Sequence, residues 1–494
     1  MNTPFRIACV VLGFQASLSQ AQIRDLIPVE VPEEVKVAWP TWLVATPTWA
    51  LRCVRNSKGD GDEAYFGQIY DRETKRPVVS AKLESGPEGM KMSKPLLHKG
   101  RLYKVYQKVD RKGGGLTVLL QEMDPETLAD VGEPLPFGSL PYKVEGEAES
   151  YVLNFDSSLD SSFLAFALTG FKDDDNQASV LVMVANDKLE PVWSKVHSIP
   201  VKAGRLLRTD VAVDGNGNVH VGYVEYAGGP ASNVFNRRRG VRLFQLNAQE
   251  AKEVEIRLPS GRSPENIALC SVAEGIAVGG YATKGSGSRD EILSTFFGHV
   301  KDNGTILEVS METELAAPIG GWASEVYLLP KSSGGFFLVG AVVPVPVTRA
   351  IHVQSISSSM SSDWQQVIPR KHGSIYGQDI FMAYAKEDKL CVVFEETAKN
   401  IARLIAGEEV GTVSDLTPKV ICRADMGEDG TPTYVAHEKG VGNGKLETMH
   451  INRAYQVGNG EQVVIIPVKE GETDGPIQIG YFEFEHGDPV ESGK

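Results

Sequence analysis

Three consecutive arginines stand out in an acidic chain. Arg237, Arg238 and Arg239 lie between Asn236 and Gly240. Guanidinium groups bind carboxylates and phosphates through paired hydrogen bonds. The cluster therefore predicts contact with an acidic ligand or partner, and the alternative is a loop whose charges only keep the surface soluble.

Further charged residues lie in other polar stretches between apolar segments. Asp173, Asp174 and Asp175 form an acidic run, which suits a cation or a basic partner, or else a solvated loop tip. Loops of this kind commonly carry binding residues. The remaining candidate contacts are Arg289, Asp290 and Arg349.

The sequence carries no metal or cofactor signature. Residues 214–218 superficially resemble the start of a calcium loop, but no Glu follows at the required distance, and a hairpin turn is the preferred interpretation. None of the nine histidines pairs with another at metal-ligand spacing. The chain also lacks HExxH, GxSxG, a phosphate-binding loop and a GxGxxG followed by a helical pattern. We expect no metal and no cofactor, and catalytic residues remain unassigned.

The charge balance narrows the class of partner. The formal net charge is −14, whereas nucleic-acid binding needs a basic surface that releases counterions from phosphates. Nucleic acid is therefore excluded as a partner, and a protein or a glycan is expected. Hydrophobic residues make up 42% of the chain, which is enough to build a large core.

The first residues indicate export. Arg6 precedes an apolar run at residues 7–14, and Ser19 and Ala21 occupy the small-residue positions of a cleavage site. We expect a signal peptide at residues 1–21 and a secreted or periplasmic mature chain; a buried N-terminal element is the alternative. The run is too short to span a bilayer, no other segment approaches that length, and no transmembrane segment is expected.

Four cysteines follow the expected signal peptide. Each lies in an apolar, strand-like run without the spacing of a metal site. Buried free thiols are favoured, although an oxidising compartment keeps disulfides as the alternative. The four residues are Cys53, Cys270, Cys391 and Cys422.

Short polar or Gly turns between two apolar runs recur along the chain. Six are separated by about 54 to 60 residues and the last gap is about 71, which indicates repeats of one structural unit. The turns lie at residues 99–100, 158–161, 215–217, 274–275, 334–335, 387–388 and 458–460.

Each repeat predicts four short strands. Residues 210–259 illustrate the unit, with alternating apolar residues, a Gly/Asn turn and a second hairpin with a polar turn. A repeated four-stranded antiparallel unit resembles the blades of β-propeller proteins. The alternative, a series of β-sandwich domains, would need linkers at roughly hundred-residue intervals, which the sequence lacks.

The resemblance implies an all-β propeller, and it rests on spacing rather than on the signature of any one family. Seven blades are favoured, with strands from both termini completing one blade, and the 64–84 hairpin is assigned to that blade. Eight blades are the alternative if residues 42–55 build a separate unit. The expected organisation is a signal peptide (1–21), a Pro/Glu-rich lead-in (22–41), one propeller domain (42–485) and a tail (486–494).

Two functions follow from these expectations. The favoured one is an exported, monomeric, non-catalytic propeller that binds a protein or a glycan. The alternative is a carbohydrate-active hydrolase or lyase that uses carboxylates from several blades. Loops between the second and third strands of each blade are longer and more varied than the Gly-rich turns, so we expect the binding site on the face that carries them.

Overall fold

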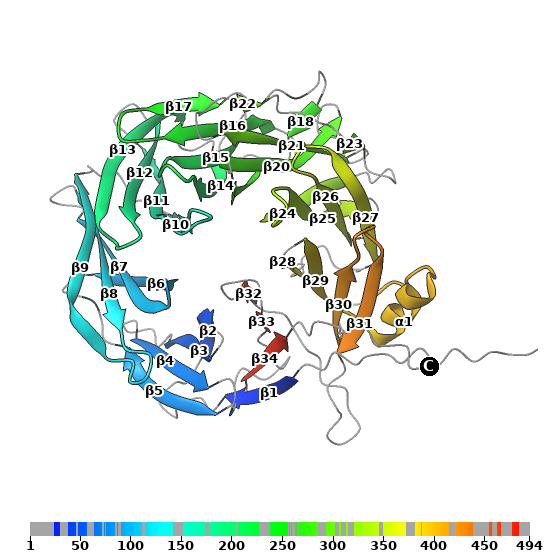
Figure 1. Ribbon diagram of the computed structural model, residues 1–494, viewed down its shortest axis with the longest axis horizontal. Coiled ribbons are helices and arrows are strands. Elements are labelled where there is room, and N and C mark those ends of the chain that lie inside the picture. Colours follow the sequence, from blue (N-terminus) through cyan, green and yellow to red (C-terminus); the bar gives the residue numbers. More distant parts are fainter. Residues whose placement is uncertain are drawn as a thin grey trace, which may run out of the picture.

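The computed structural model consists of β-strands arranged around a ring (Figure 1). The described residues are 24–29, 38–45, 48–56, 64–71, 74, 76–83, 86, 90–110, 115–141, 152–172, 177–202, 206–226, 238–254, 256, 258, 262–264, 266–273, 275–284, 293–301, 306–307, 313–314, 321–344, 349–371, 381–386, 388–413, 420–437, 454–456, 462–465 and 477–483.

Four antiparallel sheets form the first half of the ring. Blade 1 contains β2 (Ala38–Ala45), β3 (Trp49–Asn56), β4 (Ala64–Asp71) and β5 (Pro77–Leu83). Blade 2 contains β6 (Lys91–His98), β7 (Arg101–Asp110), β8 (Gly115–Met123) and β9 (Asp130–Pro141). Blade 3 contains β10 (Val152–Ser157), β11 (Phe163–Lys172), β12 (Gln177–Asn186) and β13 (Pro191–Lys202). Blade 4 contains β14 (Leu206–Val213), β15 (Val219–Tyr226), β16 (Arg238–Leu246) and β17 (Ala251–Val254).

Four more sheets complete the set. Blade 5 contains β18 (Arg262–Pro264), β19 (Ala268–Val272), β20 (Gly275–Lys284), β21 (Leu293–Lys301), β22 (Ile306–Leu307) and β23 (Thr313–Glu314). Blade 6 contains β24 (Gly321–Pro330), β25 (Phe336–Pro344), β26 (Arg349–Ile356) and β27 (Ser362–Arg370). Blade 7 contains β28 (Phe381–Lys386), β29 (Lys389–Glu396), β30 (Val420–Met426) and β31 (Pro432–His437). Blade 8 contains β32 (Ala454–Gln456), β33 (Gln462–Ile465), β34 (Ile477–Glu483) and β1 (Arg24–Val29).

This arrangement is the predicted all-β propeller. Figure 1 shows strands such as β6, β10, β14 and β24 nearest the centre, and β9, β13 and β27 at the rim. Seven blades are four-stranded; blade 5 has six strands because β18 and β19 both pair with β20, and β22 and β23 both pair with β21. Blade 5 therefore keeps the four-layer order with two interrupted strands.

The N-terminal strands build a blade of their own. β3 pairs with β4 from Trp49 opposite Asp71 to Asn56 opposite Ala64. The 64–84 hairpin therefore belongs to blade 1 and not, as predicted, to the C-terminal blade, and the alternative of eight blades is the correct one. A register shift between Pro40 and Trp42 in β2 interrupts the alternation by which an innermost strand is recognised.

Blade 8 combines strands from distant parts of the chain. β1 pairs antiparallel with β34, with Arg24 opposite Tyr481 and Val29 opposite Ile477. Part of the expected lead-in (residues 22–41) is therefore the rim strand of blade 8 (Figure 1).

The hydrophobic core lies between adjacent blades. In β11, Leu164, Phe166 and Leu168 pack toward blade 2, whereas Ala165 and Ala167 pack toward blade 4. Because successive side chains of a strand point to opposite faces, the central strands of a blade bury both faces. This explains why β11 and β12 are almost continuously apolar, with each buried large side chain contributing about 1.5–3 kcal/mol.

One helix interrupts the all-β pattern of the described residues. α1 (Ala398–Ala406) begins at Thr397, whose hydroxyl accepts a hydrogen bond from the N–H of Asn400, and ends at Gly407, which adopts a left-handed conformation. Ile401 and Leu404 are buried in the core that blades 6 and 7 share. The helix is thus held against the outside of blade 7 (Figure 1).

The four cysteines beyond the expected signal peptide are free thiols. Cys53, Cys391 and Cys422 are buried and Cys270 is half-buried, which matches the favoured interpretation. Within the described part of the chain, no helix has the length and apolar composition needed to cross a bilayer.

Candidate functional site

Two carboxylates lie on neighbouring innermost strands. Asp156 is on β10 and Asp210 on β14, and both are half-buried. Asp156 accepts a hydrogen bond from the N–H of Val213 over 3.2 Å, and Asp210 accepts one from the N–H of Leu269 over 2.7 Å. Each carboxylate therefore binds the innermost strand of the next blade, at an edge whose N–H groups need partners.

Ser271 extends this link to a third blade. Its hydroxyl donates to the carbonyl of Val213 over 2.7 Å and lies 3.4 Å from the Asp156 carboxylate. The N–H and the C=O of Val213 are thus bound by side chains from the blades on either side. Blades 3, 4 and 5 are tied together at the centre of the ring.

The surroundings of Asp156 change its protonation. Burial raises the pKa of this carboxyl to about 7; the N–H groups of Val213 and Ser157 oppose the rise, and the charge of Asp210 adds to it. The carboxyl is therefore divided between its protonated and ionised forms near neutral pH. Strongly shifted carboxyls of this kind mark candidate functional sites.

Cys270 lies beside these carboxylates on β19. Burial raises the pKa of its thiol well above the usual value, and the charges of Asp156 and Asp210 raise it further. The thiolate is the reactive form of cysteine. Cys270 is therefore poorly suited to act as a nucleophile.

The two carboxylates do not occupy equivalent positions in their blades. Asp156 lies two residues before Ser158, the first residue of its turn, whereas Asp210 lies four residues before Asp214, the first residue of the next turn. Both carboxylates accept hydrogen bonds from the backbone of the next blade, which an acid-base pair would not need. The geometry suits a structural tie or a ligand contact.

Residues 214–218 form the hairpin turn preferred over a calcium loop. The Asp214 carboxylate accepts hydrogen bonds from the N–H groups of Asn216 and Asn218, and lies 3.2 Å from Nε2 of His220. Its oxygens are thus engaged by the turn itself. In the described ranges, no three or more His, Cys, Asp or Glu side chains gather in a way that could hold a metal ion.

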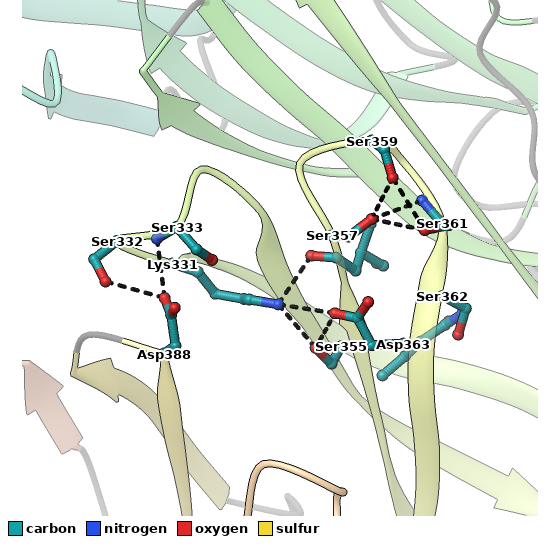
Figure 2. Close-up of polar contacts among 12 residues, drawn as sticks. Lys331, Ser332, Ser333, Ser355, Ser357, Ser359, Ser361, Ser362, Asp363 and Asp388 are labelled. Carbon is teal, nitrogen blue, oxygen red and sulfur yellow. Dashed lines mark hydrogen bonds and ion pairs between the residues drawn. The ribbon is translucent and has the colours of Figure 1, made fainter.

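The face of the ring that carries the short turns, here the turn face, is crossed by contacts between blades. Figure 2 shows Lys331, whose ammonium group donates to Ser355 over 2.9 Å and to Asp363 over 3.1 Å. In the same view, Asp388 of blade 7 accepts hydrogen bonds from the hydroxyl of Ser332 and the N–H of Ser333 in blade 6, both over 3.0 Å. These polar side chains hold turns in place.

Similar links join other blades on the turn face. The Lys99 ammonium group of blade 2 lies 2.7 Å from the Asp187 carboxylate of blade 3. The indole N–H of Trp193 in blade 3 donates to the carbonyl of Gly217 in blade 4 over 3.1 Å. Much of the described polar surface of this face therefore serves the ring itself.

The opposite face, here the loop face, carries the loops between second and third strands. The prediction that Arg238 and Arg239 are loop residues is wrong. Strand β16 begins at Arg238, which pairs with Tyr226. Arg349 begins β26 and pairs with Arg370. The other predicted contacts lie outside the described residues: Asp173, Asp174, Asp175, Arg237, Arg289 and Asp290.

The loop between β29 and β30 has a built structure that the sequence interpretation missed. The Asn400 side chain donates to the carbonyl of Gly411 and accepts from its N–H, both over 2.8 Å. The loop also reaches blade 6, where the N–H of Val413 donates to the carbonyl of Lys371 over 2.7 Å. Thr397, the apolar spacing of α1 and Gly407 were the signals that could have revealed the helix.

Comparisons with known proteins agree with the fold and go no further. No protein-family model matches the chain, and no curated protein matches it in sequence. Among solved structures, it is similar to the WD40 domain of SCAP from fission yeast, at 8% identity over 93% of this chain and 97% of that one, with a TM-score of 0.46. It is also similar to polysaccharide lyase Uly1, at 9% identity over 82% and 93%, with a TM-score of 0.40.

A third solved structure is the β-propeller domain of the Trilobed protease from Pyrococcus furiosus, at 11% identity over 74% of this chain and 91% of that one, with a TM-score of 0.39. Identities this low transfer no residue role and no activity. The pairing of the strands and their arrangement around the ring define the chain as a β-propeller protein of eight blades.

Proposed function

We propose that this protein is an exported, non-catalytic β-propeller that binds a protein or a glycan. The observation that carries the proposal is the use of Asp156 and Asp210, which lie on innermost strands near the ring centre. Each accepts a backbone hydrogen bond from the next blade, which supports a role in holding the scaffold and not in acid-base chemistry.

Export is the second part of the proposal. It rests on Arg6, the apolar run at residues 7–14 and the small residues Ser19 and Ala21. Cleavage after Ala21 leaves a chain that begins two residues before β1, so the rim strand of blade 8 stays intact. The mature protein is then secreted or periplasmic.

The partner binds on the loop face. Polar groups of the turn face link neighbouring blades, whereas the loop from Glu396 to Val413 contains a helix and is hydrogen-bonded to the preceding blade. A rigid loop loses little entropy when a partner binds. The arginines at 237 to 239 supply the charge for an acidic partner.

The test compares two variants that lose the same charge. In one, Arg237, Arg238 and Arg239 are replaced by Ser; in the other, the exposed turn-face lysines Lys188, Lys252 and Lys389 are replaced by Ser. Cross-linking in the native envelope should retain the partner with the lysine variant and lose it with the arginine variant. Equal capture by both variants would overturn the placement of the site.

A second measurement separates binding from catalysis. Asp156→Asn and Asp210→Asn each keep an oxygen that accepts the backbone hydrogen bond but remove the ionisable group. We expect the wild-type protein and both variants alike to release no reducing sugar ends from an oligosaccharide. Release of reducing sugar ends by the wild-type protein, lost in either variant, would establish the carbohydrate-active alternative instead.

A further inference from the structure

An aromatic side chain is exposed on an innermost strand. Tyr327 lies on β24 and is 41% exposed, whereas most large apolar side chains of the described core are buried. Its ring packs edge-on against Phe381 of the next blade, with centroids 5.4 Å apart and planes at 85°. The ring is therefore held in one orientation while part of it faces solvent.

Tyr327 occupies the same position in its blade as Asp210. Asp210 lies four residues before Asp214, which opens a turn with a hydrogen bond from its N–H to Asn218. Tyr327 lies four residues before Lys331, whose N–H makes the same bond to Gly335. The carboxylate and the aromatic ring are thus at the same height on their innermost strands.

The strands that carry these residues follow one another around the ring. β10 contacts β14, β14 contacts β19, and β19 contacts β24. Asp210 reaches Leu269 on β19, and Tyr327 reaches Phe381 on β28, so both side chains turn toward the next blade. Asp156, Asp210 and Tyr327 therefore lie along one continuous arc of the inner surface, seen in Figure 1 at β10, β14 and β24.

The chemistry of this arc suits a neutral, hydroxyl-rich ligand. An exposed, fixed aromatic ring offers its face to the C–H surface of a sugar, and carboxylates accept hydrogen bonds from sugar hydroxyls. Asp156 can also donate one, since its pKa of about 7 keeps part of the population protonated. Small-molecule sites are usually lined by apolar and aromatic side chains together with a few polar groups.

We propose that an oligosaccharide binds along the innermost strands from β10 to β24, with one sugar stacked on Tyr327 and others hydrogen-bonded to Asp210 and Asp156. The inference rests on the proposed binding function and adds a glycan site on the inner surface of the ring to the partner site on the loop face. Neighbouring innermost strands approach to within 8 Å between Cα atoms, so two blade steps separate Asp210 from Tyr327 by roughly 15 Å. A chain of several sugars reaches both residues, whereas a single sugar does not.

The probes are cellohexaose, chitohexaose and maltohexaose, with glucose as the short control, titrated into the full mature chain by calorimetry. We expect at least one hexasaccharide to bind and glucose to give no measurable heat. Tyr327→Ala should weaken that binding about tenfold, and Tyr327→Phe, which keeps the ring, should retain it. Leu159→Ala removes an even more exposed apolar side chain, on the turn face, and should change nothing.

The outcomes separate this inference from the function it rests on. Failure of all three hexasaccharides to bind below about 1 mM, or equal binding by Tyr327→Ala and the wild-type protein, would overturn the oligosaccharide site. If partner capture is then still lost on replacing Arg237, Arg238 and Arg239, the binding function stands and its ligand is a protein. Thermal unfolding of each variant confirms that it is folded.

Discussion

The phenolic oxygen of Tyr281 lies 2.9 Å from Nδ1 of His352, across the boundary between blades 5 and 6. Both side chains are completely buried. Burial lowers the pKa of His352 to about 4, so the imidazole is neutral at pH 7. Its Nε2 lies 3.4 Å from Oε1 of Gln365 and carries the proton, so Nδ1 accepts a hydrogen bond from the hydroxyl of Tyr281. The bond joins two blades through completely buried side chains.

Tyr281→Phe should destabilise the protein by about 1–3 kcal/mol, because it leaves a buried acceptor without its donor. Denaturant unfolding measures the change. The double variant Tyr281→Phe with His352→Leu should lose less unfolding free energy than the sum of the two single variants, because it leaves no buried donor or acceptor without its partner. Simple additivity would show that the bond contributes nothing.

His352 should also make the protein sensitive to acid. Its folded pKa of about 4 lies below the ordinary value of 6.5, so the unfolded chain binds the proton more readily between these values. The stability from neutral His352 is present above pH 6.5 and is lost as the pH falls through 4. Between pH 7.5 and 4, the wild-type protein should lose about 3 kcal/mol more than His352→Leu. A difference that does not change with pH would contradict this.

Gly340 makes room for the same tyrosine. A Cβ atom at this position would lie 2.4 Å from Cε2 of Tyr281 and 2.5 Å from its oxygen. Gly340→Ala should therefore lower the unfolding free energy by about 1–3 kcal/mol through overpacking. Gly215→Ala is the control, because nothing lies within 4 Å of the added atom. Similar melting temperatures for the two variants would argue against the close approach.

Two turns allow a reciprocal exchange. Ser161 in blade 3 and Gly217 in blade 4 both lie three residues after the start of their turns and both have positive φ, 56° and 77°. Only glycine adopts this conformation without strain. Ser161→Gly should raise stability by up to about 1 kcal/mol, and Gly217→Ser should lower it by about 1–2 kcal/mol. Thermal unfolding measures both changes. If the two variants shifted the melting temperature in the same direction, the prediction would be wrong.

Asp156 should have the opposite pH dependence to His352. Its folded pKa of about 7 lies above the ordinary 3.8, so the folded state binds the proton more readily between these values. The stability from protonated Asp156 is present below pH 3.8 and is lost as the pH rises through about 7. At pH 8, Asp156→Asn should be more stable than the wild-type protein by about 4 kcal/mol, and the gain should fade toward pH 4. An equal gain at both pH values would contradict this.

The turns and strands that depend on residues adjacent in the sequence could be predicted. The Gly turn at residues 215–217 and the hairpins around it were predictable, because turn type depends on a few adjacent side chains. Alternation also revealed most strands. Blade 1 was misassigned because the shift at Pro40 hides the alternation of β2.

The candidate site was much harder to predict. Asp156 binds the backbone of Val213, which lies 57 positions away, and a main-chain partner leaves no mark in the sequence. The importance of Tyr327 comes from its position on an innermost strand, which is known only once the blades are placed. The charged loop residues were conspicuous in the sequence because they stand out in composition, and composition says nothing about where side chains meet.

The pairing of β1 with β34 imposes an order on the synthesis of the protein. Arg24 is made long before its partner Tyr481, so this strand remains unpaired while the seven blades between them are translated. Contacts of such long sequence separation form late and slowly. Any nascent chain that stops before Ile477 lacks the strand against which β1 is held.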